Sequence, residues 1–346
     1  MIDVRNYGAI PDGVTDCATA INNALSAGDP DIIIQNGVFS LESSIKIPSN
    51  RTVYIKNAKI QLSSTAYDNI FRNSDFINGN TNISIIGQGN ACINQNPAGK
   101  ETDNSTYQKR GTYSYKYVAI TLYKVTTFTI QNIHILDHLR HSVHLNQCSY
   151  GTITNYTTNV VQGSLNPDGI DIHWGCHHIT INGMKGWTKD DFFDFICGNL
   201  TDYAVNFNTG DPMAGDIHDI TVNNVDVKDS WAGRCPAIIT GYGNKMYNIT
   251  FTNIKLRKSG ALFFNNYTNF YTPPYVAPSK DDIHDFIFDN CEINSLIVND
   301  DAAFIFGQSI KNFAATNITN NSGKALYQLV AGDQTDNVKI NGSQVV

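Results

Sequence analysis

The feature that most constrains the fold is a short phrase that returns through most of the chain. Each copy holds two or three strand-forming residues, one spacer, and then Asn or Gly, as in Phe-Thr-Ile-Gln-Asn at 128–132. The copies end at Asn132, Asn155, Gly183, Asn224, Asn253, Asn290, Asn317 and Gly342. The steps between these ends are 23, 28, 41, 29, 37, 27 and 25 residues. A unit of 23 to 29 residues with longer excursions is typical of a solenoid.

The make-up of the phrase indicates which solenoid. Alternate apolar residues such as Ile130 and Ile153 should face the core, and a closing Asn or Gly suits a turn in the left-handed region. A leucine-rich solenoid would show Leu at fixed offsets, and a β-sandwich would have strands every 8 to 12 residues. We therefore predict an all-β fold, a single-stranded right-handed parallel β-helix.

The first 30 residues differ from the rest and predict a strand, a turn and a short helix. Asp16 is a suitable N-cap for a helix that runs through Leu25 and ends at Gly28, and it would cap the open end of the core. We expect one domain over 1–346, with the strand and capping helix in 1–30 and the coils in 31–346. Three long excursions should wall a binding groove, at 97–116, 197–218 and 265–284.

Charge and cysteine usage exclude several classes of function. A net charge of −7 and a pI near 5.6 argue against nucleic acid and anionic membranes as partners, and no apolar run reaches spanning length. The seven cysteines form no Cys-x-x-Cys pair, so we expect small core residues rather than a zinc or redox site. The chain starts at Met1 with no basic and apolar leader, so we expect a removed signal or a virion protein, extracellular or virion-associated.

A pattern of paired aspartates occurs twice at the repeat spacing. Asp168-x-x-Asp171 returns 23 residues later as Asp191-x-x-Asp194, with Asp190 directly before the second copy. If the flanking apolar residues face the core, Asp171 and Asp194 point away from it, and Asp168 and Asp191 lie in the turns before two strands. Neighbouring strands are about 4.8 Å apart, so Asp168, Asp190 and Asp191 could converge.

Clustered carboxyl groups are costly to keep together, because like charges at short range raise each other's pKa. Such a set is a candidate acid and base pair, and two carboxyl groups at moderate separation are what glycoside hydrolysis requires. Any one aspartate is better explained as a polar turn residue. The set, repeated at the coil spacing, favours a catalytic site.

These motifs carry a family resemblance. The run Asn166–Asp171 (Asn-Pro-Asp-Gly-Ile-Asp), followed one coil later by Asp190 and Asp191, resembles the polygalacturonase-like glycoside hydrolases of family 28. The opening residues 6–9 and 12–16 resemble the start of pectin-lyase-like proteins, which include many phage tail-spike depolymerases. The fold resemblance covers nearly the whole chain, and the catalytic motif covers roughly 166–194.

The resemblance implies roles for the three aspartates. Asp190 would be the general acid, and Asp168 and Asp191 would hold the attacking water, with inversion of the anomeric centre and no cofactor. The chain departs from the family at two places. The family has a Gly-His-Gly motif, but residues 232–236, which correspond to it here, contain no His. The family's charged Arg-Ile-Lys motif corresponds to residues 261–265, which are uncharged here. We therefore expect the substrate to be a polysaccharide other than pectin, either a neutral glycan or one that is charged differently from pectin.

Other residues are candidates for substrate binding. They are Asp171, Asp194, Arg140, His141, His144, Arg234 and Tyr242. Arg140, His141 and His144 precede Asp168 by one coil and either bind a sugar or are exposed turn residues. A dense group of aromatic residues follows Asp171, and it predicts packing at a strand end rather than a metal site. The group contains His173, Trp174, His177 and His178. Trp187 and Trp231 either stack on sugar rings or pack against the coils.

Two other functions remain open from the sequence. A polysaccharide lyase on the same fold would need Ca²⁺ and would release an unsaturated product. A non-catalytic glycan-binding module of a phage tail spike would bind without turnover, and would be a homotrimer if it resembles such spikes. We expect no metal and no cofactor for the hydrolase.

Overall fold

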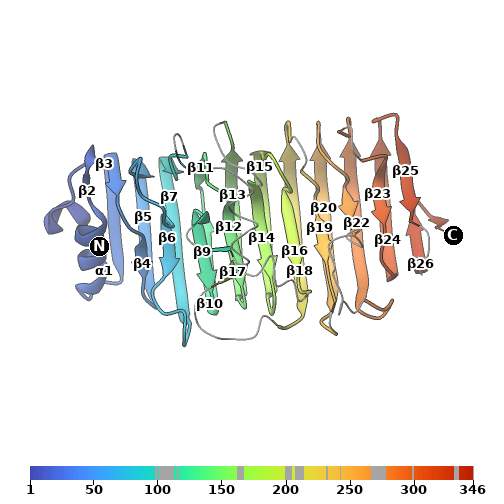
Figure 1. Ribbon diagram of the computed structural model, residues 1–346, viewed down its shortest axis with the longest axis horizontal. Coiled ribbons are helices and arrows are strands. Elements are labelled where there is room, and N and C mark those ends of the chain that lie inside the picture. Colours follow the sequence, from blue (N-terminus) through green and yellow to red (C-terminus); the bar gives the residue numbers. More distant parts are fainter. Residues whose placement is uncertain are drawn as a thin grey trace. The chain divides into compact units, whose positions relative to one another are not determined.

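The computed structural model describes residues 1–97, 100, 113–114, 117–161, 167–198, 205–206, 214–230, 233–241, 243–265, 278–297, 300–330 and 335–345. The chain divides into two compact units. Unit 1 comprises Met1–Pro167 and Asp202–Asp211, and unit 2 comprises Asp168–Thr201 and Pro212–Val346. In each unit, the strands that lie side by side are about one coil apart in sequence (Figure 1).

Unit 1 contains a long and a short parallel sheet. The long sheet runs in the order β1 (Ile2–Asp3), β3 (Asp31–Leu41), β5 (Arg51–Leu62), β7 (Asn80–Asn94), β10 (Val125–Gln131) and β13 (Ser149–Asn159), with β2 (Asp12–Asp16) beside β3 and β11 (His134–Leu136) beside β7 and β13. The short sheet runs in the order β4 (Ile45–Ile47), β6 (Phe71–Asn73), β9 (Ile120–Tyr123) and β12 (His141–Asn146). Strands β8 (Tyr113–Ser114) and β17 (Val205–Asn206) pair with each other.

Unit 2 repeats this arrangement. Its long sheet runs in the order β15 (His177–Trp187), β18 (Ile217–Val227), β20 (Met246–Leu256), β22 (Ile283–Ile293), β24 (Ile310–Asn320), β26 (Thr335–Ile340) and β27 (Ser343–Gln344). Its short sheet runs in the order β14 (Asp168–His173), β16 (Phe193–Ile196), β19 (Ala237–Ile239), β21 (Phe263–Phe264), β23 (Ala302–Phe306) and β25 (Ala325–Leu329). Only the pairing of β26 with β27 is antiparallel among the described strands.

Parallel strands joined by whole coils make a parallel β-helix, right-handed as parallel crossovers are, and this confirms the predicted fold class. A single domain over 1–346 stays a prediction. The three long excursions expected to wall a groove lie largely outside the described residues. None of the helices in the described ranges is both long and apolar enough to cross a membrane.

The predicted capping helix is present as α1 (Ala18–Ser26), at the dark blue end of the coils of unit 1 in Figure 1. It contacts β3, β4 and the 3₁₀ helix η1 (Val4–Tyr7) and buries Ile21 and Leu25. Its predicted N-cap was wrong by one residue, whereas Gly28 ends the helix as predicted, because it follows the C-cap Ala27 with φ at 97°. The N-cap is Cys17, and the carboxylate of Asp16, one residue before it, accepts both the Ala18 N–H and the Glu42 N–H at 3.0 Å. The last helical residue is Ser26.

The phrase that repeats in the sequence forms a sharp bend within each long strand. Its closing asparagines have φ near +55°, for example 50° at Asn155 and 57° at Asn253, so the predicted left-handed turn is confirmed. The same asparagines bond from coil to coil. Asn253 Nδ2 donates to Asn224 Oδ1 at 3.1 Å, and Asn290 Nδ2 donates to Asn253 Oδ1 at 2.5 Å. Asparagine therefore suits this position in two ways: its backbone adopts the left-handed conformation readily, and its amide forms hydrogen bonds to the neighbouring coils.

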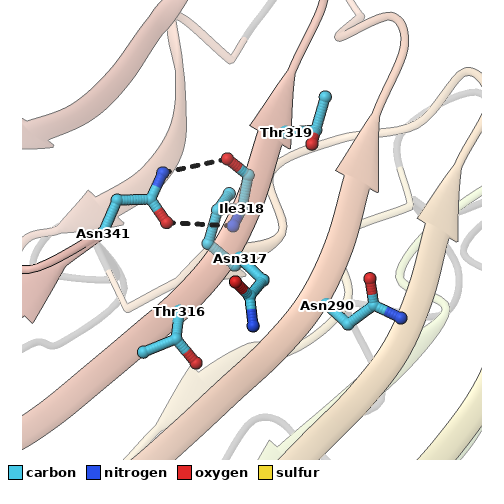
Figure 2. A pocket seen from close by; sticks show the side chains of 6 residues that line it. All are labelled: Asn290, Thr316, Asn317, Ile318, Thr319 and Asn341. Carbon is cyan, nitrogen blue, oxygen red and sulfur yellow. Dashed lines mark hydrogen bonds between the residues drawn. The ribbon is translucent and has the colours of Figure 1, made fainter.

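Another asparagine bonds the sheet in the turn between β26 and β27, one residue before the last phrase ends at Gly342. Figure 2 shows Asn341, whose Nδ2 donates to Ile318 O and whose Oδ1 accepts from Ile318 N, both at 2.9 Å. The amide thus bonds the edge of β24 as a further strand would. Around it lies an open polar hollow of about 660 Å³, lined by Asn290, Thr316, Asn317, Ile318, Thr319 and Asn341. None of the candidate aspartates lines this hollow.

Replacing Asn253 tests the column. Asn253→Ala should lower the free energy of unfolding by about 1–2 kcal/mol. Alanine is sterically strained in the left-handed backbone of this position, and it lacks the amide that makes two side-chain hydrogen bonds. Asn253→Gly should cost less, because Gly removes only the hydrogen bonds. Urea unfolding measures both, with Thr252→Ala as the neighbouring control. Equal losses in all three variants would contradict the argument.

The core of unit 2 contains a stack of phenylalanines from successive coils. The ring centroids of Phe195 and Phe251 lie 6.0 Å apart, those of Phe251 and Phe288 4.9 Å, and those of Phe288 and Phe313 5.4 Å. The cysteines also pack as expected, since six of the seven are buried and Cys92 is half-buried. Burial raises the pKa of the Cys197 thiol to about 12, which keeps it protonated and unreactive.

Candidate active site

One column of polar residues runs across three coils of unit 2. Ile170 lies opposite Phe193, and the Gly169 N–H donates to Asp191 O at 2.8 Å, so Asp168 and Asp191 occupy the same position in successive coils. The Phe192 N–H donates to Arg234 O at 2.8 Å, which puts Arg234 at that position one coil further on. Asp168 begins β14 rather than lying in the turn before it, whereas Asp191 lies in a turn, as predicted.

The coils approach closely at this column. A Cβ on Gly169 would lie 2.2 Å from Phe192 O, so no other residue fits there without moving the backbone. A Cβ on Gly233 would lie 2.8 Å from Asp190 O. The two glycines therefore let the chain segments that carry Asp168, Asp190 and Asp191 approach one another.

A second pair of carboxylates lies in the adjoining column. Asp171 and Asp194 are register partners on β14 and β16, and both are buried, with 0% and 8% of their surfaces exposed. His173 Nε2 lies 3.8 Å from Asp171 Oδ2, which shows that residues 171 and 173 share one face of the strand. The prediction that Asp171 and Asp194 alternate with core residues agrees with this, but the two side chains are covered rather than exposed.

Arg234 connects the column to a residue that the sequence did not indicate. Its backbone N–H donates to Asp191 Oδ1 at 3.0 Å, and its Nη1 lies 3.5 Å from the same oxygen. Its Nε lies 3.5 Å from Oδ2 of the buried Asp300, which also accepts the Ala261 N–H at 2.8 Å. The guanidinium carbon lies 3.9 Å from the centre of the Phe264 ring. Asp191 therefore has a fixed positive charge beside one oxygen.

Asp190 lies in the same turn but is half-buried, whereas Asp191 is buried. The turn is held by Thr188, whose hydroxyl donates to Asp190 O at 2.6 Å. The Ser230 hydroxyl oxygen accepts the Thr188 N–H at 3.1 Å. Of the two adjacent aspartates, Asp190 is therefore the one more open to a solvent molecule or a substrate.

The other predicted binding residues belong to unit 1 or lie outside the described ranges. Arg140, His141 and His144 belong to unit 1 and are all buried, so their interpretation as exposed turn residues is wrong. β12 is covered on both faces, which removes the exposure that a turn would give. Arg140 Nε and His141 Nε2 lie 2.5 Å apart, and the rings of His141 and His144 lie 6.2 Å apart. Tyr242, Trp231 and Asn166 lie outside the described residues.

His144 should make the stability of the protein depend on pH. Burial, and secondarily the charge of Arg140, lower its pKa from 6.5 to about 3. The unfolded state then takes up a proton below about pH 6.5 that folded His144 does not, so stability is lost as pH falls from that value. From about pH 6.5 to about pH 5 the loss should be about 2 kcal/mol, since one pKa unit is worth about 1.4 kcal/mol.

Urea unfolding at pH 7.5 and pH 5 measures this loss. His144→Asn should reduce the difference between the two pH values, because it removes the buried imidazole whose pKa is lowered. An unchanged difference in His144→Asn would rule out His144 as the cause.

The histidine group of the sequence separates into two places. His173 and Trp174 are buried and pack edge to face at 5.2 Å, as expected for strand-end packing. His177 and His178 begin the outer strand β15, where the His177 ring stacks on that of His218 at 4.9 Å and the His178 ring meets it edge to face at 5.8 Å, which agrees with packing at a strand end. Two groups of described residues have potential ligand atoms within 4.8 Å of one another in unit 2: Asp171, His173 and Asp194, and His178, His218 and Asp219. The first belongs to the candidate active site.

Residues 31–295 match the family described as Glycosyl hydrolases family 28. The chain belongs to glycosyl hydrolases family 28. The family assignment confirms the resemblance on which the roles of the aspartates were predicted, and the matched range includes both aspartate columns.

Solved structures similar to this family 28 chain have the same fold. Endo-xylogalacturonan hydrolase from Aspergillus tubingensis has a TM-score of 0.66 and 11% identity, over 97% of this chain and 96% of that one. An exopolygalacturonase from Thermotoga maritima has a TM-score of 0.61 and 14% identity, over 98% of this chain and 92% of that one. At these identities the likeness shows the fold alone.

A phage protein also matches this family 28 chain in sequence. The pre-neck appendage protein of Bacillus phage B103 is 38% identical over 89 residues, which are 24% of this chain and 10% of the phage protein. The match thus spans about one tenth of the length of that relative. Gene product 12 of bacteriophage phi29 is similar in structure, with a TM-score of 0.55 and 14% identity over 96% of this chain and 51% of that one.

Proposed function

We propose that this protein hydrolyses the glycosidic bonds of a polysaccharide at the aspartates of unit 2. The observation that carries the proposal is the column in which Asp168 and Asp191 occupy the same position of successive coils, with Asp190 beside them in the turn. Membership of family 28 supports a glycan as substrate.

The surroundings of the three aspartates indicate which of them acts as the acid and which act as the base. Asp191 accepts the Arg234 N–H and lies beside the Arg234 guanidinium, and both favour its carboxylate form. Asp191 and Asp168 would therefore orient a water molecule and take its proton. Asp190 is the more exposed aspartate and would donate its proton to the glycosidic oxygen as the bond to the anomeric carbon breaks. Water attacks from the opposite face, so the product has the inverted configuration.

The charges of the site argue against pectin as the substrate. Arg234 is already placed between Asp191 and Asp300, so its charge is partly compensated within the protein. Residues 261–265 are uncharged, and Ala261, Leu262, Phe263 and Phe264 are all buried. A polysaccharide of neutral sugars, or one whose charges lie elsewhere on the ring, fits this site better than one that carries a carboxylate on every residue.

The phage match favours a second candidate, in which the chain is the glycan-binding module of a virion appendage. It would then bind a cell-surface polysaccharide and be extracellular or virion-associated, as a homotrimer if it assembles like a tail spike. The 38% identity to a pre-neck appendage protein supports this setting, and it is compatible with hydrolysis. Binding without turnover would separate the two.

Release of reducing ends from pectic, capsular and cell-wall polysaccharides tests the proposal. We expect activity on at least one glycan other than polygalacturonate, with proton NMR of the first products showing the inverted anomer. An unsaturated product would indicate a lyase and overturn the proposal. Binding of a glycan without release of reducing ends would establish the binding module instead.

A further inference from the structure

The outer face of unit 2 carries an exception in a regular column. His178, Asp219, Asn248, Asp285, Asn312 and Asn337 occupy equivalent positions of successive coils, and each has φ between 52° and 58°. Asn and Asp are the non-glycine residues that accept this backbone most readily, and five of the six members obey that preference. His178 is the sixth, and it differs from the other five in carrying an imidazole, although histidine also adopts this backbone more often than most residues do.

His178 lies beside two other potential metal ligands. Its Nδ1 is 3.5 Å from Asp219 Oδ2, and that same oxygen is 2.8 Å from His218 Nδ1. One ligand atom from each of the three residues lies within 4.8 Å of the others. Ligands about 2.1 Å from a tetrahedral metal ion are about 3.4 Å apart, so small side-chain rotations would complete the set. All three side chains are partly accessible to solvent, at 46%, 29% and 23% for His178, Asp219 and His218.

We propose that His178, His218 and Asp219 bind a divalent transition-metal ion that bridges strands β15 and β18. Two imidazoles and one carboxylate are a ligand set for Zn²⁺, Ni²⁺ or Cu²⁺, whereas Ca²⁺ and Mg²⁺ prefer oxygen ligands alone. The solvent would supply the remaining ligands, since the group is open to water. Because the ligands come from two successive coils, the bound ion would connect strand β15 to strand β18.

The same face contains a natural control. His284 and Asp285 repeat the arrangement of His218 and Asp219, with His284 Nδ1 again 2.8 Å from Asp285 Oδ2. Asn248 stands there where His178 stands in the proposed site, one coil before the pair. A histidine and aspartate pair therefore occurs on this sheet without the second imidazole. The difference between the two places is His178.

Isothermal titration of tag-free, EDTA-treated and dialysed protein with Zn²⁺ tests the proposal. The wild type should bind one Zn²⁺ at this site. His178→Asn, which introduces the residue that the column uses elsewhere, should weaken binding by at least ten-fold, because even loss of a group behind a metal ligand costs about 10–100-fold. His284→Tyr should leave the affinity unchanged, and Ca²⁺ should not compete.

Thermal unfolding gives an independent measurement. Zn²⁺ should raise the unfolding midpoint of the wild type and of His284→Tyr, and not that of His178→Asn, since only binding to the folded state stabilises it. Equal Zn²⁺ affinity in the wild type and His178→Asn would overturn the proposal, as would an equal loss in His284→Tyr. His178→Asn should fold without metal as well as the wild type does, because asparagine suits the left-handed backbone.

Discussion

Asp190→Asn should lower the turnover number for polysaccharide hydrolysis by about 10²- to 10⁴-fold, the contribution of a positioned general acid. The amide keeps the shape of the side chain and the backbone contact that Thr188 makes to Asp190 O, but it has no proton to give to the leaving oxygen. Because the side chain is half-buried and its backbone is held separately, the free energy of unfolding should change little. Initial rates of reducing-end release, with kcat and KM determined separately, measure the effect.

The matched control is Asp229→Asn. Asp229 also belongs to unit 2, but it is 63% exposed and its Oδ1 lies 2.9 Å from Lys258 Nζ on the surface. This variant should retain wild-type kcat. A loss confined to KM in Asp190→Asn would assign Asp190 to substrate binding, because removal of an acid acts on the transition state. Undiminished kcat would exclude Asp190 as the acid and return the role to Asp168 or Asp191.

The sequence predicts most of the fold because one backbone requirement repeats with every coil. Each bend needs a residue in the left-handed region, and Asn132, Asn155 and Asn253 supply it at a step that can be counted. The pairing of Asp168 with Asp191 could be predicted for the same reason, since the 23 residues between them make one coil without an excursion. The pairing of residues between successive coils can be predicted from the sequence wherever the number of residues per coil is constant.

Where an excursion intervenes, the register cannot be counted. Arg234 follows Asp191 by 43 residues, and only the hydrogen bonds show that the two share a position. Asp300 is further away still and has no motif around it that indicates a site. The burial of Arg140, His141 and His144 also escaped prediction, because polar residues on a strand are expected to face solvent, whereas β12 is covered on both faces.

Phe251→Ala should lower the free energy of unfolding by about 3–5 kcal/mol, the cost of truncating a fully buried phenylalanine. The Phe251 side chain is not exposed to solvent, and its ring lies parallel to that of Phe288 at 4.9 Å and 6.0 Å from that of Phe195. Each coil of a solenoid rests only on its two neighbours, so the cavity would weaken both interfaces of this coil. Urea unfolding followed by far-UV circular dichroism measures the loss.

Ile287→Ala is the control for this prediction, because Ile287 lies next to Phe288 on β22 but points outward with 48% of its surface exposed. It should cost no more than about 0.5 kcal/mol. A small loss in Phe251→Ala would mean that neighbouring side chains refill the space, and the stack would then contribute little beyond its buried area. A loss at the upper end would mean that the coil cannot collapse, because both neighbouring rings are held by their own strands.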